Sequence, residues 1–191
     1  MKAKFVVILV MMLGVCPLLQ AQDNKVDERV KLARQIYPER LEQIKTIRQY
    51  EADGIPAINY LTAVRKQNWA GSGMSTDKME FYYHEIDDEY DLPLGYTLAM
   101  VRRTYNVGGR NFFEEFVYDD DGNPLFWFCR YDSFEGPNAE LRGYFDADGT
   151  LLRTLDKNVT GDEDVTYNFA AATRNFPRFK RAFDALYEVD Y

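Results

Sequence analysis

The residues that could carry out nucleophilic or general-base chemistry are few in this chain. There is a single histidine, His84, and of the two cysteines only Cys129 lies outside the N-terminal segment. His84 could serve as a general base for Cys129 or for a serine, because such catalysis needs a nucleophile within hydrogen-bond reach of its base. No serine stands in a nucleophile-elbow pattern, and nothing in the spacing places a nucleophile beside His84. We therefore predict no catalytic residues.

Acidic residues are the second possible source of chemistry. They cluster at Asp87–Asp91, Glu114–Glu115 and Asp162–Asp164. A glycosidase needs two carboxylates at a defined separation in a cleft. Glu114 and Glu115 cannot form such a pair, because neighbouring strand residues point to opposite faces. A small glycan-directed hydrolase stays open as an alternative, and it requires His84, or two carboxylates from different strands, to meet in one pocket.

Two similar stretches, Tyr118–Asn123 and Phe145–Thr150, contain Asp-x-Asp-Gly. Alternating aspartates before a glycine could present oxygens to calcium, but a calcium hand also needs a third acidic position and a bidentate glutamate. Both stretches instead fit a hairpin turn with a bulge, in which glycine takes the left-handed position. With one histidine, the chain also lacks the ligands of a Cys/His zinc site. We predict structural turns, with no metal and no cofactor.

Aromatic residues make up 15% of the chain and are the remaining candidates for a site. Exposed tyrosine and tryptophan can stack on sugar rings or form a protein-binding patch, because they join an apolar body to a polar tip. We predict a non-catalytic binding module of the cell envelope or periplasm, with glycans among its candidate ligands. An apolar-ligand carrier is a further alternative, which needs a dry cavity between sheet and helices. The predicted binding residues are Trp69, Tyr82, Tyr83, His84 and Trp127.

Residues 1–21 have the pattern of a secretory signal peptide. A basic start, Met1–Lys4, precedes an apolar run, Phe5–Leu19, and Ala21 offers a small residue for cleavage. The run is short for a membrane span, and no later segment is long and apolar enough for one. We therefore expect an exported chain, periplasmic or secreted, without a transmembrane span after cleavage.

A lipid anchor at Cys16 is the alternative to simple cleavage. We favour cleavage, because Val15 stands where a lipoprotein signal has a small residue and Pro17 follows the cysteine directly. The formal net charge of −8 opposes unspecific nucleic-acid binding, so we expect no nucleic-acid partner. Cys129 then remains as a lone thiol, and its aromatic neighbours Phe126–Phe128 predict that it is buried.

Hydrophobic periodicity predicts the elements that position these residues. Apolar residues recur with a helical period over Val26–Tyr50, where Pro38 predicts a kink or two abutting helices. A second amphipathic stripe predicts a helix over Asn175–Val189. Between them the period is two, which predicts antiparallel strands joined by short turns. The predicted strands are Ala57–Trp69, Lys78–Ile86, Leu94–Val107, Arg110–Tyr118, Pro124–Asp132, Glu140–Phe145, Thr150–Asp156 and Val165–Phe169.

Gly108–Gly109 predicts a two-residue hairpin turn, because glycine accepts the positive φ that such turns need. In that register Arg103 lies opposite Glu114, and Arg102 lies opposite Glu115. Tandem arginines could form an anion site, but two cross-strand ion pairs on opposite faces explain them more simply. Such pairs, when exposed, contribute little to stability.

Three stretches, Ile55–Tyr60, Arg65–Gly73 and Lys78–Tyr83, resemble small secreted proteins of Bacteroidetes-type gut bacteria. The leader, ending in Gln-Ala-Gln, is similar to theirs as well. This resemblance implies export, but it implies no activity and transfers no functional residues.

The predicted fold class is α+β. A twisted antiparallel meander of about seven to eight strands, curled at most into a half-barrel, is packed by an N-terminal and a C-terminal helix. The predicted organisation is a signal peptide over 1–21 and one domain over 22–191. Within that domain 22–54 is helical, 55–170 forms the sheet and 171–191 is the C-terminal helix.

Overall fold

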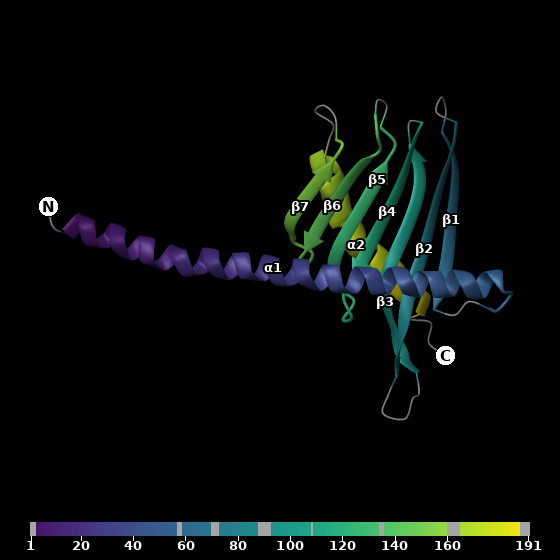
Figure 1. The fold of residues 1–191 in the computed structure, drawn as a ribbon, viewed down its shortest axis with the longest axis horizontal. Helices are drawn as coiled ribbons and strands as arrows, with labels where there is room; N and C mark the ends of the chain where they lie inside the picture. The colour runs from purple at the N-terminus through teal and green to yellow at the C-terminus, as the bar shows by residue number, and fades with distance from the viewer. Residues whose placement is uncertain are drawn as a thin grey trace.

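In the computed structural model, one helix lies across the front of an antiparallel sheet and a second helix lies behind it (Figure 1). The described residues are 3–56, 59–69, 73–87, 93–107, 109–133, 136–159 and 165–187. The side chains of 3–23, 69, 87, 93 and 165–167 also fall outside the description. The elements are α1 (Ala3–Ala52), β1 (Tyr60–Trp69), β2 (Gly73–Asp87), β3 (Pro93–Val107), β4 (Arg110–Tyr118), β5 (Pro124–Tyr131), β6 (Ala139–Phe145), β7 (Leu151–Lys157) and α2 (Val165–Tyr187).

The seven strands are neighbours in the order in which they occur along the chain, and every pairing is antiparallel. This α+β meander, with a helix before it and a helix after it, confirms the predicted fold class. The sheet is open, so β1 and β7 are its edges. Neither helix has, within the described residues, a stretch apolar enough to cross a membrane.

The helix α1 packs against the sheet through Val30, Ala33, Ile36, Ile44 and Ile47, which are all buried. It is one helix and not two abutting ones, since it continues without a break through Pro38. The same sheet face holds the helix on both sides of Pro38, and that packing outweighs the loss of one backbone hydrogen bond. Its start at Ala3 also differs from the predicted start at Val26.

The other face is covered by α2, which corrects one predicted strand. Val165–Phe169 was expected to be extended, but it is the first part of this helix. Tertiary packing decides the outcome, because helical spacing places Phe169 in line with Phe176 and Phe183, and all three are buried against the sheet. Phe169 also meets the ring of Trp127 at 5.5 Å. The helix therefore begins at residue 165 and not at the predicted Asn175.

The β3–β4 hairpin has the predicted register, with Arg103 opposite Glu114 and Arg102 opposite Glu115. Both ion pairs form, at 3.2 and 2.8 Å. The expectation that they are exposed is wrong, since Glu114 and Glu115 are only 3% and 1% exposed. The two carboxylates are therefore withdrawn from solvent, while Arg102 and Arg103 stay partly exposed.

Burial gives Glu114 a pH-dependent role in stability. Burial raises the pKa of Glu114. The Arg103 charge opposes this shift but does not cancel it, because Arg103 also pairs with Asp77 at 2.8 Å. The folded protein thus holds the Glu114 proton more tightly than the unfolded chain does. The resulting stabilisation is complete below the ordinary glutamate pKa and is lost as pH rises through the folded pKa.

We expect the stability of Glu114→Gln, compared with that of the wild type, to increase as the pH rises from 4 to 7. The amide carries no charge to bury and can still accept the Trp127 Nε1–H bond, which is 3.2 Å long. Chemical unfolding of both proteins at the two pH values tests this. Titration of all other groups affects both proteins alike, so it drops out of the difference between their free energies of unfolding. A shift in favour of the wild type at pH 7 would contradict the raised pKa.

Both Asp-x-Asp-Gly stretches form the predicted turns. Gly122 and Gly149 have φ of 76° and 85°, and the N–H of each donates to the carbonyl of the aspartate three residues before it. The turns lie at the end of the sheet that α1 crosses. There Arg29 pairs with Asp119 at 3.0 Å, and Lys25 pairs with Asp146. The acidic turns therefore help to dock α1.

Candidate ligand-binding face

The sheet face that carries α1 is only partly covered, and its uncovered part is the candidate site. Side chains lie there in three rows that run across the strands, because antiparallel partners point to the same face. We call these rows the open face. From α1 outward, its central residues are Arg102, Glu115, Phe128 and Arg142, then Thr104, Phe113, Arg130 and Glu140, then Asn106, Asn111, Asp132 and Asn138.

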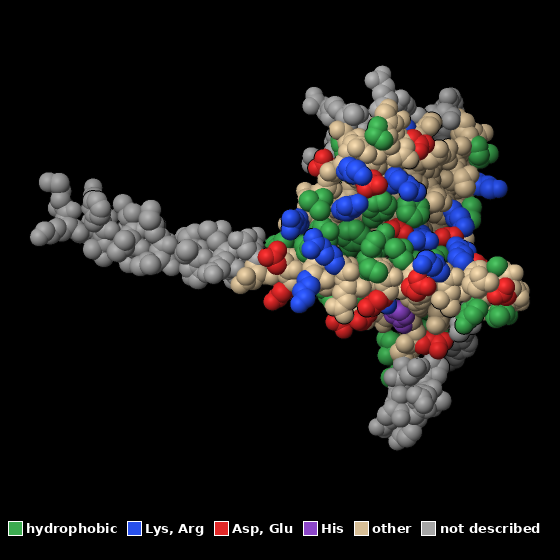
Figure 2. Space-filling view, viewed as in Figure 1, with side chains coloured by type: hydrophobic (Ala, Val, Ile, Leu, Met, Phe, Trp, Pro, Cys, Tyr) green, Lys and Arg blue, Asp and Glu red, His purple; other side chains and the backbone are tan. Residues whose placement is uncertain are grey.

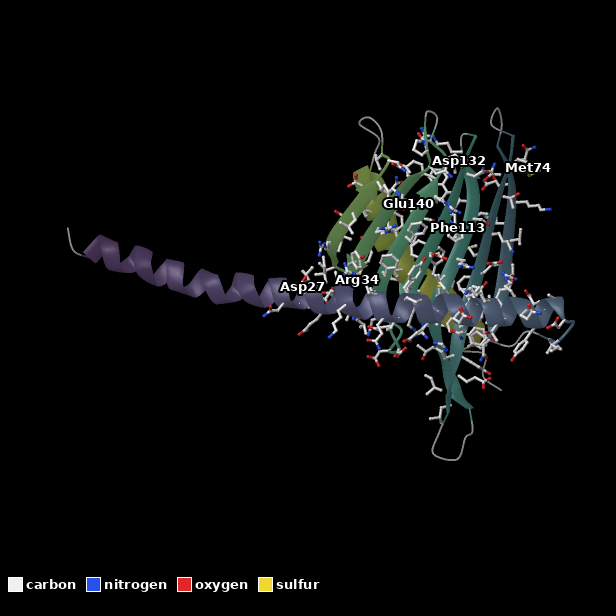
Figure 3. The ribbon with its side chains drawn as sticks, in the orientation of Figure 1. Asp27, Arg34, Met74, Phe113, Asp132 and Glu140 are labelled. Carbon is white, nitrogen blue, oxygen red and sulfur yellow. The ribbon has the colours of Figure 1, made fainter. Side chains whose placement is uncertain are left out.

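Aromatic rings and guanidinium groups alternate on this open face. Phe113 lies between Arg102 and Arg130, whose guanidinium carbons are 5.8 and 5.5 Å from its ring centre. Arg142 stands 5.9 Å from the ring of Phe128. Figure 2 shows hydrophobic side chains gathered above α1 and bordered by lysine and arginine. Figure 3 places Phe113 and Glu140 on this face, and Asp132 at its far end.

The cationic character of the open face is only partly neutralised. Glu115 accepts a hydrogen bond from Arg102 at 2.8 Å, and Glu140 accepts one from Arg142 at 3.0 Å. Arg130 has no ion pair with any described residue. Arg34, on the neighbouring surface of α1, has none with the described part of the chain either (Figure 3). A protein with a net charge of −8 thus exposes Arg130 and Arg34 around one surface without an ion pair to a described residue.

Glu115 fixes the position of α1 beside the open face. It accepts a hydrogen bond from the Tyr37 hydroxyl as well as from Arg102. Burial and the Glu115 charge together raise the pKa of Tyr37, so its hydroxyl remains a donor at all ordinary pH values. This buried contact holds α1 against the sheet along one side of the open face.

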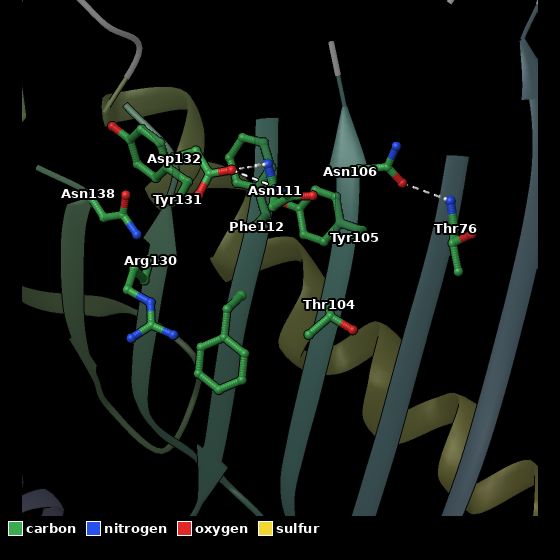
Figure 4. A pocket seen from close by; sticks show the side chains of 11 residues that line it. Thr76, Thr104, Tyr105, Asn106, Asn111, Phe112, Arg130, Tyr131, Asp132 and Asn138 are labelled. Carbon is green, nitrogen blue, oxygen red and sulfur yellow. Dashed lines mark hydrogen bonds between the residues drawn. The ribbon is translucent and has the colours of Figure 1, made fainter. Parts of the chain in front are cut away.

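A pocket of about 430 Å³ occupies the hairpin end of the open face (Figure 4). Its walls combine aromatic rings with amide and hydroxyl groups, and Asp132 is the one carboxylate among its lining residues. Asp132 accepts the side-chain N–H of Asn111 at 2.7 Å, and Asn106 accepts the backbone N–H of Thr76 at 2.9 Å. The side chains of Thr104 and Asn138 have no hydrogen bond with a described residue and remain available to a ligand.

A second pocket, of about 320 Å³, lies where α1 meets the sheet. Four aromatic rings line it, and Tyr37 and Tyr144 each stand within 5.2 Å of the ring of Phe126. Arg34 and Arg142 also line this pocket, and no carboxylate does. Pockets of this size with a few convergent polar groups are typical of small-ligand sites.

The structure separates the predicted binding residues and does not bring them together. Trp127 is fully buried beneath α2, where Glu114 satisfies its N–H. Tyr82 is 1% exposed under α1, and its hydroxyl contacts Arg48 at 3.1 Å. Neither ring is accessible to a ligand. A binding patch that uses these two rings is therefore not formed, because α2 covers Trp127 and α1 covers Tyr82.

The other predicted residues lie apart from the open face. Tyr83 packs under the end of α2 against Phe183, at 5.4 Å between ring centres. His84 Nδ1 lies 3.4 Å from Gln43 Nε2 of α1. Trp69 is the last residue of β1, and its side chain lies outside the described residues. Neither Tyr83 nor His84 lines either pocket described above.

The groups that could act in catalysis are placed unfavourably for it. Burial lowers the pKa of His84, assisted by the Arg40 charge, and no hydroxyl or thiol of the described residues is paired with the ring. Burial raises the pKa of the Cys129 thiol, so it does not form a thiolate nucleophile. Asp77 and Glu114 do meet, at Arg103, but both are buried and line neither pocket.

Sequence reasoning missed Phe113, Phe128, Arg34, Arg130 and Arg142. A signal existed, because Phe113–Arg130 and Phe128–Arg142 follow from strand register as cross-strand and same-face neighbours. Periodicity alone did not reveal which of the two sheet faces stays open.

The fold and the site define a class of protein: an antiparallel α+β meander in which part of one sheet face is not covered by a helix. Comparisons with protein-family models, with curated proteins and with solved structures found no match to this chain.

Proposed function

We propose that the protein is an exported, non-catalytic binding module that holds a saccharide on the open face. The observation that carries the proposal is the partly exposed Phe113 ring, flanked by guanidinium groups and adjoining a pocket lined by amides and hydroxyls. A sugar ring has apolar C–H faces that pack on aromatic rings and hydroxyls that bond to amide and hydroxyl side chains.

Export is proposed with this function on the strength of the N-terminal pattern, since the leader-like run fits a secreted or periplasmic chain. A hydrolase is less well supported, because one carboxylate, Asp132, lines the hairpin pocket where glycoside hydrolysis needs two. A lipid carrier is also less well supported. Aromatic rings fill the layer between the sheet and α2: the ring centre of Phe116 lies 5.2 Å from that of Phe176 and 4.9 Å from that of Phe179.

Binding of an oligosaccharide is expected to weaken about tenfold in Phe113→Ala, since loss of one stacked ring costs about 1 kcal/mol or slightly more. A glycan array selects the ligand for the wild type, and isothermal titration then measures both proteins. Asn138→Ala, at an exposed residue of the same pocket, is expected to weaken binding severalfold.

The matched control is Tyr50→Ala, which removes an exposed aromatic ring at the far end of α1. Thermal unfolding of each variant shows that it is folded. Binding that survives Phe113→Ala and Asn138→Ala unchanged would contradict the proposed site. Absence of any saccharide ligand on the array would contradict the proposed function.

A further inference from the structure

The charges around the open face narrow the class of saccharide. Arg130 projects from the middle row and has no ion pair with a described residue, while its cross-strand partner Glu140 bonds to Arg142 instead. Arg34 reaches the α1 pocket from the helix and is also exposed and unpaired within the described chain. Two guanidinium groups on one surface, one in its middle row and one beside α1, therefore have no ion pair with a described residue.

The α1 pocket has the composition of an anion site and not of a neutral one. Both of its charged lining residues are arginines, and its other lining residues are four aromatic residues and one alanine. Arginine presents N–H groups in a planar fork that matches a carboxylate, and the match is stronger than that with a neutral hydroxyl. Glu140 partly neutralises Arg142, so Arg34 is the free charge in this pocket.

Arg130 is separated along β5 from the α1 pocket that Arg34 lines. Along β5, Arg130 is four residues from Phe126, which lines the α1 pocket, and four residues of strand span about 13 Å. The ring of Phe113 lies opposite Arg130, and the ring of Phe128 lines the α1 pocket; their centres are 6.4 Å apart. A ligand that reaches both arginines is longer than one sugar ring and crosses an aromatic floor.

We propose that the ligand is an acidic oligosaccharide of the uronate type, whose carboxylates bind Arg130 at one end and Arg34 with Arg142 at the other. Sugar rings between them pack on Phe113 and Phe128. This inference rests on the proposed function and adds the charge of the ligand to it.

The test compares ligands that differ only in charge. Oligogalacturonate is the charged probe, and its methyl-esterified form is the neutral one. Short alginate and hyaluronan fragments extend the acidic set, heparin fragments supply sulfate, and oligoglutamate supplies carboxylates without sugar rings. We expect wild-type affinity to be at least about tenfold higher for an acidic probe than for its neutral counterpart. This preference should shrink between about 0.05 M and 0.5 M salt, as charges at an exposed face are screened.

Arg130→Gln and Arg34→Gln are each expected to reduce affinity for the uronate about tenfold more than they reduce affinity for the neutral probe. Both residues are exposed and unpaired within the described structure, so these variants should fold normally. Arg178→Gln, at an exposed arginine on α2 behind the sheet, is the matched control and should change nothing.

The outcomes separate the inference from the function on which it rests. Equal binding of neutral and acidic oligosaccharides, with Phe113 still required, overturns the inference and leaves the binding module standing. Preference for heparin over every uronate overturns the carboxylate assignment. Oligoglutamate binding as tightly as the uronates shows an acidic peptide partner and overturns both proposals. Failure of every saccharide to bind also overturns both.

Discussion

Phe176→Ala is expected to lower the free energy of unfolding by about 3–5 kcal/mol, because it empties the centre of the layer under α2. The Phe176 side chain has no exposed surface. Its ring lies 5.2 Å from that of Tyr118 and 4.8 Å from that of Phe145. Alanine would lose these contacts and leave a cavity that rigid aromatic neighbours cannot close.

Chemical denaturation of the wild type and the variant measures this loss, with Leu186→Ala as the control on the same helix. Leu186 is 56% exposed, so its removal should change the stability by no more than about 0.5 kcal/mol. Similar losses for the two variants would show that α2 does not pack on the sheet as described.

Arg29→Met is expected to cost about 3 kcal/mol or more, because it removes the charge that joins α1 to two separate turns. Arg29 Nη1 pairs with Asp119 at 3.0 Å. Its other nitrogens donate to the backbone carbonyls of Phe145, at 2.9 Å, and Pro124. Methionine keeps most of the apolar stem but leaves Asp119 and two carbonyls without this donor.

The control for this substitution is Lys31→Met, two residues further along α1, where the side chain is exposed and has no partner among the described residues. We expect its stability to stay close to that of the wild type. If Arg29→Met and Lys31→Met unfold at the same denaturant concentration, the Arg29 contacts do not hold α1 on the sheet.

Local sequence signals were sufficient to predict most of the sheet. The Gly-Gly pair gave the β3–β4 register, and the Asp-x-Asp-Gly turns gave two further hairpins, because left-handed backbone positions restrict the residue choice. Val165–Phe169 was predicted incorrectly, since its β-branched and aromatic residues favour a strand locally and only packing on Trp127 makes it helical.

The candidate site was harder to predict than the fold. β4 and β5 place aromatics on both faces, as with Phe112 and Phe113 or Trp127 and Phe128. Alternation assigns these residues to two faces but does not indicate which face a helix covers. Only the positions of the two helices show that Phe113 and Phe128 stay accessible, because α1 covers Tyr82 at one end of its face and α2 covers Trp127 on the other face.

The central claim is that the open face is the ligand-binding surface, and mapping of backbone amide signals by NMR tests it most directly. The full chain is labelled with ¹⁵N and titrated with the oligosaccharide that binds best. We predict that the shifted signals come from the open face, around Thr104, Phe113, Arg130 and Arg142, and from Arg34 on α1. Shifts confined to α2 or to the edge strand β1, with the open face unchanged, would contradict the claim.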